Sequence, residues 1–151
     1  MKRWLTTLVV VLFIVLIADS NVLAYEESKT KYFGVGATVE EIEQATFQVK
    51  TMGEKSEEGF IYTPVQIKKG KDMTFKVTLQ GDGTVFLKLV ETDSKGRFIN
   101  EHTTPMILLT SDWKAYKLPA TLNEKTAQID TLVITGGKQQ MNFMFRDVAV
   151  E

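Results

Sequence analysis

The chain has 151 residues, with 18 Lys or Arg against 19 Asp or Glu, and it contains no cysteine. The absence of cysteine excludes a disulfide framework and a cysteine metal site. A net charge of −1 gives no electrostatic reason to bind nucleic acid or anionic lipid.

The first 24 residues differ from the rest of the chain. Met1-Lys2-Arg3 is basic, Leu5–Ala18 is apolar, and Val22-Leu23-Ala24 has the small-x-Ala pattern of a cleavage site. This pattern predicts a secretory signal peptide and therefore a secreted protein, and the lack of cysteine favours a bacterial one. The alternative is an uncleaved membrane anchor, which requires roughly 20 apolar residues. The apolar run has about 14, so we expect no stable membrane span after cleavage.

We expect residues 25–36 to form a flexible N-terminal segment, because they are charged at first and then broken by glycine. Residues 37–151 are predicted to form one domain, long enough to bury a core without disulfides. Within it, Ala37–Glu43 is compatible with a strand or a short helical turn, whereas Thr46–Thr51 alternates like a strand.

The next strand is predicted in two pieces, Phe60–Thr63 and Val65–Ile67, interrupted by Pro64. Proline lacks the N–H that a central strand must donate, so an edge strand or a bulge is expected here. Met73–Leu79 alternates apolar and polar residues without exception. The following Gly81-Asp82-Gly83 predicts a tight return into an antiparallel strand at Val85–Val90.

The C-terminal half continues the pattern, and Gly136-Gly137-Lys138 predicts a hairpin turn before the last strand. The strands expected here are Arg97–His102, Met106–Thr110, Trp113–Leu118, Ala127–Thr135 and Met141–Val150. Eight to ten short strands with no long helix after the leader predict an all-β antiparallel β-sandwich of the jelly-roll type.

Three motifs, in this order, resemble the jelly-roll carbohydrate-binding modules of the xylan- and glucan-binding group, which have a galactose-binding-like β-sandwich. They are Lys69–Phe75 (KGKDMTF), Asp112–Tyr116 (DWKAY) and Phe143–Val150 (FMFRDVAV). The resemblance covers roughly residues 37–151 and implies a module that binds polysaccharide without catalysis.

Members of this group often carry an aromatic residue on the wet face of the strand after the first motif, because a flat ring stacks on a sugar. Here that face carries only Thr74, Lys76, Thr78 and Gln80. Phe86, on the wet face of the following strand, is the best substitute platform.

The expected ligand-binding set comprises Tyr62, Lys76, Thr78, Phe86, Lys88, Arg97 and Glu101. In this set Phe86 and Lys88 are expected to lie beside Lys76 and Thr78. Trp113 is expected mainly in the core, with a sugar platform as the alternative.

We expect neither a metal nor a cofactor. Arg146 stands where the resembled modules have the first Asp of their closing motif, and a guanidinium there opposes a calcium ion. His102, the single histidine, is expected to be a satisfied surface or rim residue and not a catalytic one.

The sequence contains no nucleophile elbow, HExxH motif or phosphate loop, so the protein is not expected to be an enzyme. An enzymatic role would require Glu101 and a second carboxylate in one cleft. The predicted function is a secreted module that binds a cell-wall or extracellular polysaccharide. The alternative is an interaction protein of the cell surface or biofilm matrix that binds a protein partner and has lost sugar binding.

Overall fold

The structure is a computed structural model that describes residues 31–64, 67 and 70–151. The predicted signal peptide, residues 25–30 and most of the predicted strand Val65–Ile67 lie outside the described residues. The strands are β1 (Phe33–Val35), β2 (Ala37–Glu43), β3 (Thr46–Thr51), β4 (Gly59–Tyr62), β5 (Asp72–Gly81), β6 (Thr84–Thr92), β7 (Phe98–Thr103), β8 (Ile107–Leu108), β9 (Lys114–Thr121), β10 (Gln128–Thr135) and β11 (Asn142–Val150). Nothing in the described ranges forms a helix suited to crossing a membrane.

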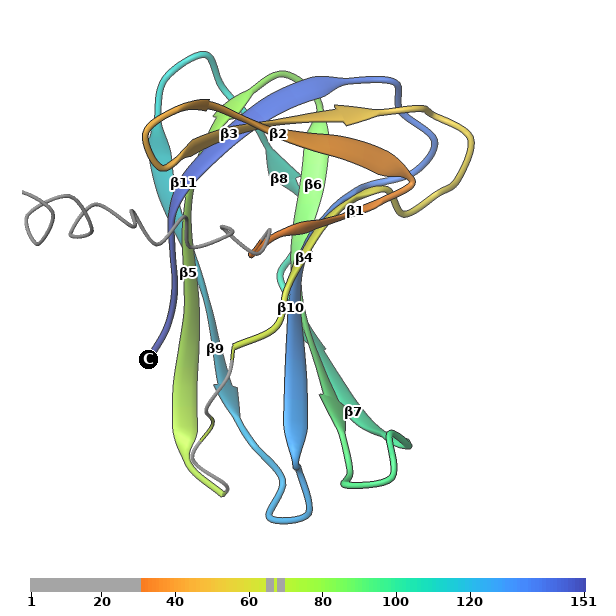
Figure 1. Cartoon of the computed structure of the whole chain (residues 1–151), viewed down its shortest axis with the longest axis vertical. Helices are drawn as coiled ribbons and strands as arrows, with labels where there is room; N and C mark the ends of the chain where they lie inside the picture. The colour runs from red at the N-terminus through yellow and green to blue at the C-terminus, as the bar shows by residue number, and fades with distance from the viewer. Residues whose placement is uncertain (1–30, 65–66, 68–69) are drawn as a thin grey trace, which may run out of the picture.

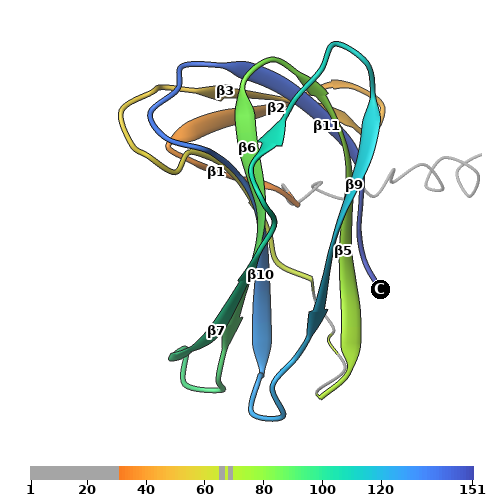
Figure 2. The ribbon, with the colours of Figure 1, turned by 180° about the vertical axis from the view of Figure 1, so that it is seen from behind.

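The strands form two antiparallel sheets that pack face to face (Figures 1 and 2). Sheet A has the order β1-β4-β10-β6-β7, and β8 pairs with β6 at its side. Sheet B has the order β2-β3-β11-β5-β9. This arrangement confirms the predicted all-β antiparallel sandwich, and it settles the ambiguous segment Ala37–Glu43 as the edge strand β2.

The core lies between the sheets, where alternate residues of each strand meet. Phe75 and Leu79 of β5 face Leu87 and Leu89 of β6, and each of the four is at most 1% exposed. Because side chains alternate across a strand, the neighbours of these residues are directed to the two outer faces of the sandwich. The outer faces therefore carry side chains that are accessible to ligands.

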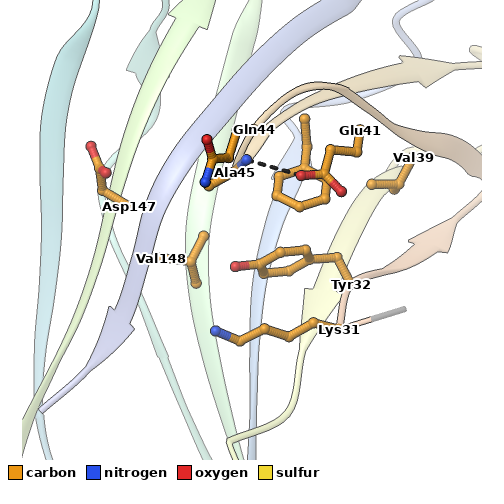
Figure 3. A pocket seen from close by; sticks show the side chains of 9 residues that line it. Lys31, Tyr32, Val39, Glu41, Gln44, Ala45, Asp147 and Val148 are labelled. Atoms are coloured by element: carbon orange, nitrogen blue, oxygen red, sulfur yellow. Dashed lines mark hydrogen bonds between the residues drawn. The ribbon is translucent and has the colours of Figure 1, made fainter. Parts of the chain in front are cut away.

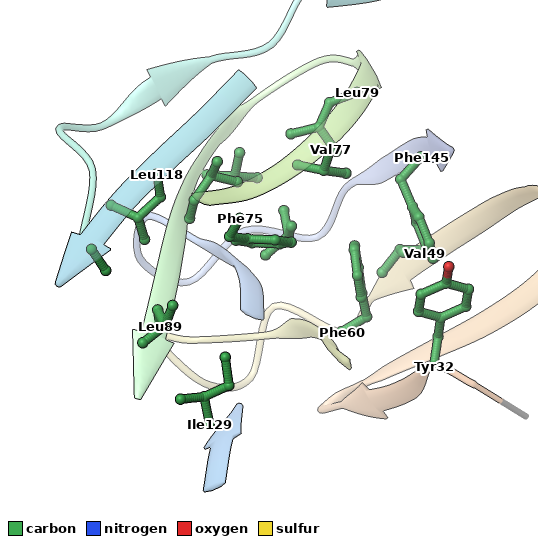
Figure 4. Close-up of a cluster of buried hydrophobic side chains, with 14 of the residues drawn as sticks. Tyr32, Val49, Phe60, Phe75, Val77, Leu79, Leu89, Leu118, Ile129 and Phe145 are labelled. Carbon is green, nitrogen blue, oxygen red and sulfur yellow. The ribbon is translucent and has the colours of Figure 1, made fainter. Parts of the chain in front are cut away.

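An aromatic cluster fills one end of the core (Figure 4). The rings of Phe60 and Phe145 are stacked with centroids 3.8 Å apart, and Tyr32 meets Phe145 edge-on at 4.9 Å. Tyr32 is only 6% exposed. The expectation of a flexible segment up to residue 36 is therefore wrong for its last part, because Tyr32 is anchored in the core and β1 pairs with β4.

Two turns that were predicted to join neighbouring antiparallel strands instead connect strands of different sheets. Gly81-Asp82-Gly83 connects β5 of sheet B to β6 of sheet A, and Gly136–Lys138 lies in the connection from β10 of sheet A to β11 of sheet B. The strands on either side therefore lie in opposite layers and do not pair. The apolar faces of both strands remain satisfied, because each sheet supplies one wall of the same core.

The prediction of an edge or bulged strand next to Pro64 is also wrong. β4 lies between β1 and β10 and pairs with both. It ends at Tyr62, so Pro64 is beyond the ladder and removes no donor from it. Thr63 instead donates a side-chain hydrogen bond of 2.5 Å to Asp130 of β10.

Candidate functional site

The predicted ligand-binding set does not form one site, because its members lie on both sides of the sandwich. Lys76 and Thr78 are on the outer face of β5 in sheet B, whereas Phe86 and Lys88 are on the outer face of β6 in sheet A. The buried residues of both strands meet in the core between them. The expectation that these four residues lie side by side is therefore wrong.

Lys88 has two carboxylate partners on the outer face of sheet A. Its ammonium lies 3.0 Å from Glu57 and 3.3 Å from Glu101. Burial lowers the pKa of Lys88, but its hydrogen bonds and charge interactions with the two glutamates raise it, and the net shift is upward. Glu101 is therefore paired with Lys88, and Glu57 is a second carboxylate paired with the same lysine.

The two remaining members of the set are engaged in structural contacts. Tyr62 faces inward and packs against the core, with its ring centroid 5.7 Å from that of Tyr32. Arg97 lies in the β6–β7 turn, where its guanidinium is 2.6 Å from Asp93. Neither residue lies with Lys76 and Thr78.

His102 faces the interior and holds a buried carboxylate. Its Nε2 is 2.9 Å from Glu91, which is 0% exposed and also accepts hydrogen bonds from the Thr126 hydroxyl and the Asn123 amide. This cluster joins β6, β7 and the loop before β10. This agrees with the expectation of a satisfied surface or rim residue, since His102 is paired with Glu91 and partly buried.

An aromatic platform is present on the outer face of sheet B. Trp113, directly before β9, is half-buried and has its ring on this face, where the guanidinium carbon of Arg146 lies 4.4 Å from the ring centroid. The guanidinium stacks on the indole and so fixes the orientation of the Trp113 ring. This contact overturns the expectation that Trp113 lies in the core.

A hollow of about 350 Å³ lies on the same face. Neither Trp113 nor Arg146 lines it, but its lining includes Thr78, which is in register with Arg146, and Ala115, which is two residues from Trp113 on the same side of the strand. Thr78 and Ala115 face each other in register, and their short side chains form its floor. Lys76 and Lys117 form the next row of the same face, also in register. Lys76 is ion-paired with Glu151, whereas Lys117 takes part in no ion pair within the described ranges.

The third side of the hollow is formed by a bulge in β11. The register of β11 on β5 shifts between Arg146 and Ala149, and Asp147 at the bulge has a φ of 53°. The bulge turns the Asp147 carboxylate toward the hollow and lets β11 resume its inward alternation at Val148. The face thus combines a flat ring, cations and a carboxylate around a shallow depression.

These groups can bind an uncharged or acidic polyol, with the ring against C–H groups and the charged side chains on hydroxyls. A metal ion would need several oxygen ligands. Among the residues that the structure describes, no group of three or more His, Asp or Glu side chains could hold one.

The outward position of Trp113 has a signal in the sequence. In residues 113–118 the inward residues are Tyr116 and Leu118. Leu118 is 5% exposed and belongs to the core, and Tyr116 packs against it. Because side chains alternate along a strand, residues an odd number of positions before Leu118 point to the opposite face. Trp113, Ala115 and Lys117 therefore share the outer face. Its stacking partner Arg146 comes from a distant strand and carries no local signal.

The sequence matches no family model and no curated protein. The structure, however, is similar to solved carbohydrate-binding modules. One is the CBM22-1–GH10 modules of endo-1,4-β-D-xylanase 10B of Clostridium thermocellum, complexed with xylohexaose, with a TM-score of 0.67 and 13% identity over 80% of this chain and 26% of that one. A separate structure of the C-terminal family 22 module of that xylanase has a TM-score of 0.61 and 16% identity, covering 83% of this chain and 88% of the module.

A structure described as CBM4 has a TM-score of 0.57 and 15% identity, covering 80% of this chain and 85% of that one. The enzymatically active domain of tailspike protein 4 of bacteriophage CBA120 is also similar, with a TM-score of 0.64, 10% identity and coverage of 80% of this chain and 19% of that one. At these identities the similarity establishes the fold. The chain has the jelly-roll β-sandwich of carbohydrate-binding modules, as the sequence motifs predicted.

Proposed function

We propose that this protein is a secreted, non-catalytic module that binds a cell-wall or extracellular polysaccharide on the outer face of sheet B. The observation that carries the proposal is the Trp113 ring, held by Arg146 next to the hollow over Thr78 and Ala115. The fold shared with carbohydrate-binding modules supports it. Secretion is supported by the leader-like residues 1–24.

The proposal moves the binding surface away from five of the seven residues of the predicted set. Lys76 and Thr78 stay in it, and Trp113, Arg146 and Lys117 join them. Phe86 and Lys88 lie on the opposite side of the molecule. Phe86 therefore provides a matched control for Trp113, because it is another half-buried aromatic residue on an outer face.

The test is retention of the protein on insoluble xylan, cellulose, chitin and isolated cell walls. The full chain is expressed with its own leader and recovered from the culture medium, and its N-terminus is read by mass spectrometry. We expect retention on at least one material, a loss of affinity of about thirtyfold or more in Trp113→Ala, and no change in Phe86→Ala, since a central aromatic anchor contributes roughly 2 kcal/mol or more. A folded protein that binds none of the materials would refute the proposal.

The alternative, binding to a protein partner, has one observation in its favour. Three large apolar side chains in or near sheet A are exposed: Phe33 at 60%, Met106 at 60% and Leu108 at 70%. Met106 and Leu108 flank Ile107, which pairs with Val85 beside Phe86, whereas Phe33 lies on the edge strand β1. Exposed apolar side chains favour protein contacts over sugar contacts. If Phe86→Ala abolished retention on cell walls and Trp113→Ala did not, the binding surface would be this face.

A further inference from the structure

A second cavity, with a volume of about 640 Å³, opens at the side of the sandwich (Figure 3). One wall comes from the segment before β1 and from the β2–β3 hairpin, and the opposite wall comes from the bulge of β11. We call it the Tyr32 pocket. It is separate from the hollow beside Trp113, although Asp147 lines both.

The interior of the Tyr32 pocket is apolar and aromatic. The rings of Tyr32 and Phe47 meet edge-on with centroids 4.7 Å apart, and Val39 and Val148 flank them. All four side chains also pack against the core, so their positions are fixed by the fold. A ligand with an apolar face finds a rigid surface here.

The hydroxyl of Tyr32 points into the pocket toward Val148 (Figure 3). The residue as a whole is only 6% exposed, and no hydrogen bond joins its hydroxyl to another described residue. The hydroxyl oxygen is not itself enclosed, because Arg146 Nε is the one buried polar side-chain atom that lacks a partner in the described ranges. Burial, with a smaller effect of Tyr62, raises the pKa of this phenol to about 12. The group therefore stays protonated at neutral pH and presents an unused donor and acceptor to whatever occupies the pocket.

The rim of the pocket offers both donors and acceptors. One oxygen of Glu41 accepts a hydrogen bond of 2.9 Å from the backbone amide of Ala45, and the carboxylate faces the aromatic wall. Gln44, Lys31 and Asp147 complete the rim. The Asp147 carboxylate is directed away from the other residues of the pocket, so the groups available at the rim are an amide, an ammonium and one carboxylate (Figure 3). Such a rim suits a ligand with several hydroxyl groups better than an ion of either sign.

The backbone around the pocket is strained on both sides. Ala45 has a φ of 56° and Asp147 a φ of 53°, and in the described part of the chain no other non-glycine residue has a positive φ. Such conformations are unfavourable for residues with a Cβ, and they concentrate at ligand-binding sites because surrounding structure must hold them. Both strained residues line the Tyr32 pocket.

We propose that the Tyr32 pocket binds a single pyranose ring, the terminal residue of a glycan. A pyranose has a C–H face that fits the Tyr32 and Phe47 rings and hydroxyl groups that fit the Tyr32 phenol, Glu41 and Gln44. The β2–β3 turn and the β11 bulge close the pocket on two sides, so it receives the end of a sugar chain. This proposal does not depend on the function proposed for the outer face of sheet B.

The test follows the amide signals of the full, secreted protein by NMR during titration with D-glucose, D-galactose, D-xylose and N-acetyl-D-glucosamine. We expect saturable shifts at Glu41, Ala45 and Val148 with at least one of the four sugars. Tyr32→Phe keeps the ring and removes the hydroxyl, so its affinity should fall about fivefold, the value of one neutral hydrogen bond. Tyr62→Phe makes the same chemical change on a neighbouring ring that does not line the pocket, and should bind normally.

No saturable shift with any of the four sugars, or equal affinities of Tyr32→Phe and the unaltered protein, would overturn the proposal. Trp113→Ala separates this site from the outer face of sheet B. It should abolish retention on polysaccharide while leaving the monosaccharide shifts at Ala45 unchanged. The two proposals can thus fail independently.

Discussion

Arg146 and Trp113 form a stacked pair that reaches across β5. Arg146 is on β11 and Trp113 directly precedes β9, and β5 lies between these two strands in sheet B. The pair therefore ties three strands together on one face. The guanidinium lies over one face of the indole ring.

Arg146→Ala is expected to lower the free energy of unfolding by about 0.5–1 kcal/mol, the value of a partly exposed cation–π contact. The chain contains two tryptophans, and Trp4 lies in the predicted leader, so the fluorescence of the cleaved protein reports on Trp113 alone. Removing the guanidinium should shift the emission to longer wavelength, because water then reaches the ring. Arg146→Lys retains the charge but not the planar group, and an emission as blue as that of the unaltered protein in either variant would contradict the stacking.

Glu91→Gln is expected to lower the free energy of unfolding by roughly 2–3 kcal/mol, because a buried carboxylate loses charge-assisted hydrogen bonds from Thr126, Asn123 and His102. Urea unfolding at neutral pH measures this change. Glu101→Gln, on the exposed side of the same β6–β7 pair, provides the control and should change stability by less than about 1 kcal/mol. Equal effects of the two substitutions would contradict the burial of Glu91.

The same carboxylate should make the protein sensitive to acid. Burial raises the pKa of Glu91, but the hydrogen bonds from Thr126, Asn123 and His102 lower it, and the net shift is below the ordinary value of 4.5. A lowered pKa in the folded state means that the stabilisation is complete above about pH 4.5 and is lost as the pH falls through the folded value. Stability measured from neutral pH downward should therefore decline less steeply in Glu91→Gln than in the unaltered protein.

Gly59→Ala is expected to destabilise the fold by roughly 3 kcal/mol or more, or to prevent folding. A Cβ at Gly59 would lie 2.0 Å from the carbonyl oxygen of Val133 in the adjacent strand β10, and a backbone atom in a central ladder cannot move aside. Gly96→Ala is the control, because nothing lies within 4 Å of that position and only its φ of 74° is unfavourable. Its cost should be about 1 kcal/mol, and thermal unfolding of both variants compares them.

The period-two pattern correctly predicted which residues of β5 and β6 are buried, because burial on one face of a strand is a local property. It could not predict which layer each strand joins. Gly81 and Gly83 allow the chain to turn sharply, but the turn residues do not determine whether the next strand pairs with β5 or crosses to the other sheet. The prediction that Phe86 lies beside Lys76 assumed that β5 and β6 form a hairpin. Because the chain crosses to the other sheet instead, the predicted site differs from the one proposed on sheet B.

The aromatic groups of both proposed sites depend on contacts between residues far apart in the sequence. The position of Trp113 could have been counted from Leu118, but its orientation depends on Arg146, which is 33 residues further along the chain. The burial of Tyr32 depends on Phe60 and Phe145. No local pattern around Tyr32 distinguishes it from a solvent-exposed tyrosine in a charged segment.

The bulge places Asp147 in the lining of both the hollow and the Tyr32 pocket, with its carboxylate turned toward the hollow. A glycan bound to that carboxylate would act on the same backbone that forms one wall of the pocket. A glycan on the outer face and a sugar in the pocket would then affect each other's binding, and by thermodynamic reciprocity each would change the affinity for the other by the same factor. One irregular residue in β11 would in that way couple two neighbouring cavities, so that the length of a polymer and its end are not bound independently.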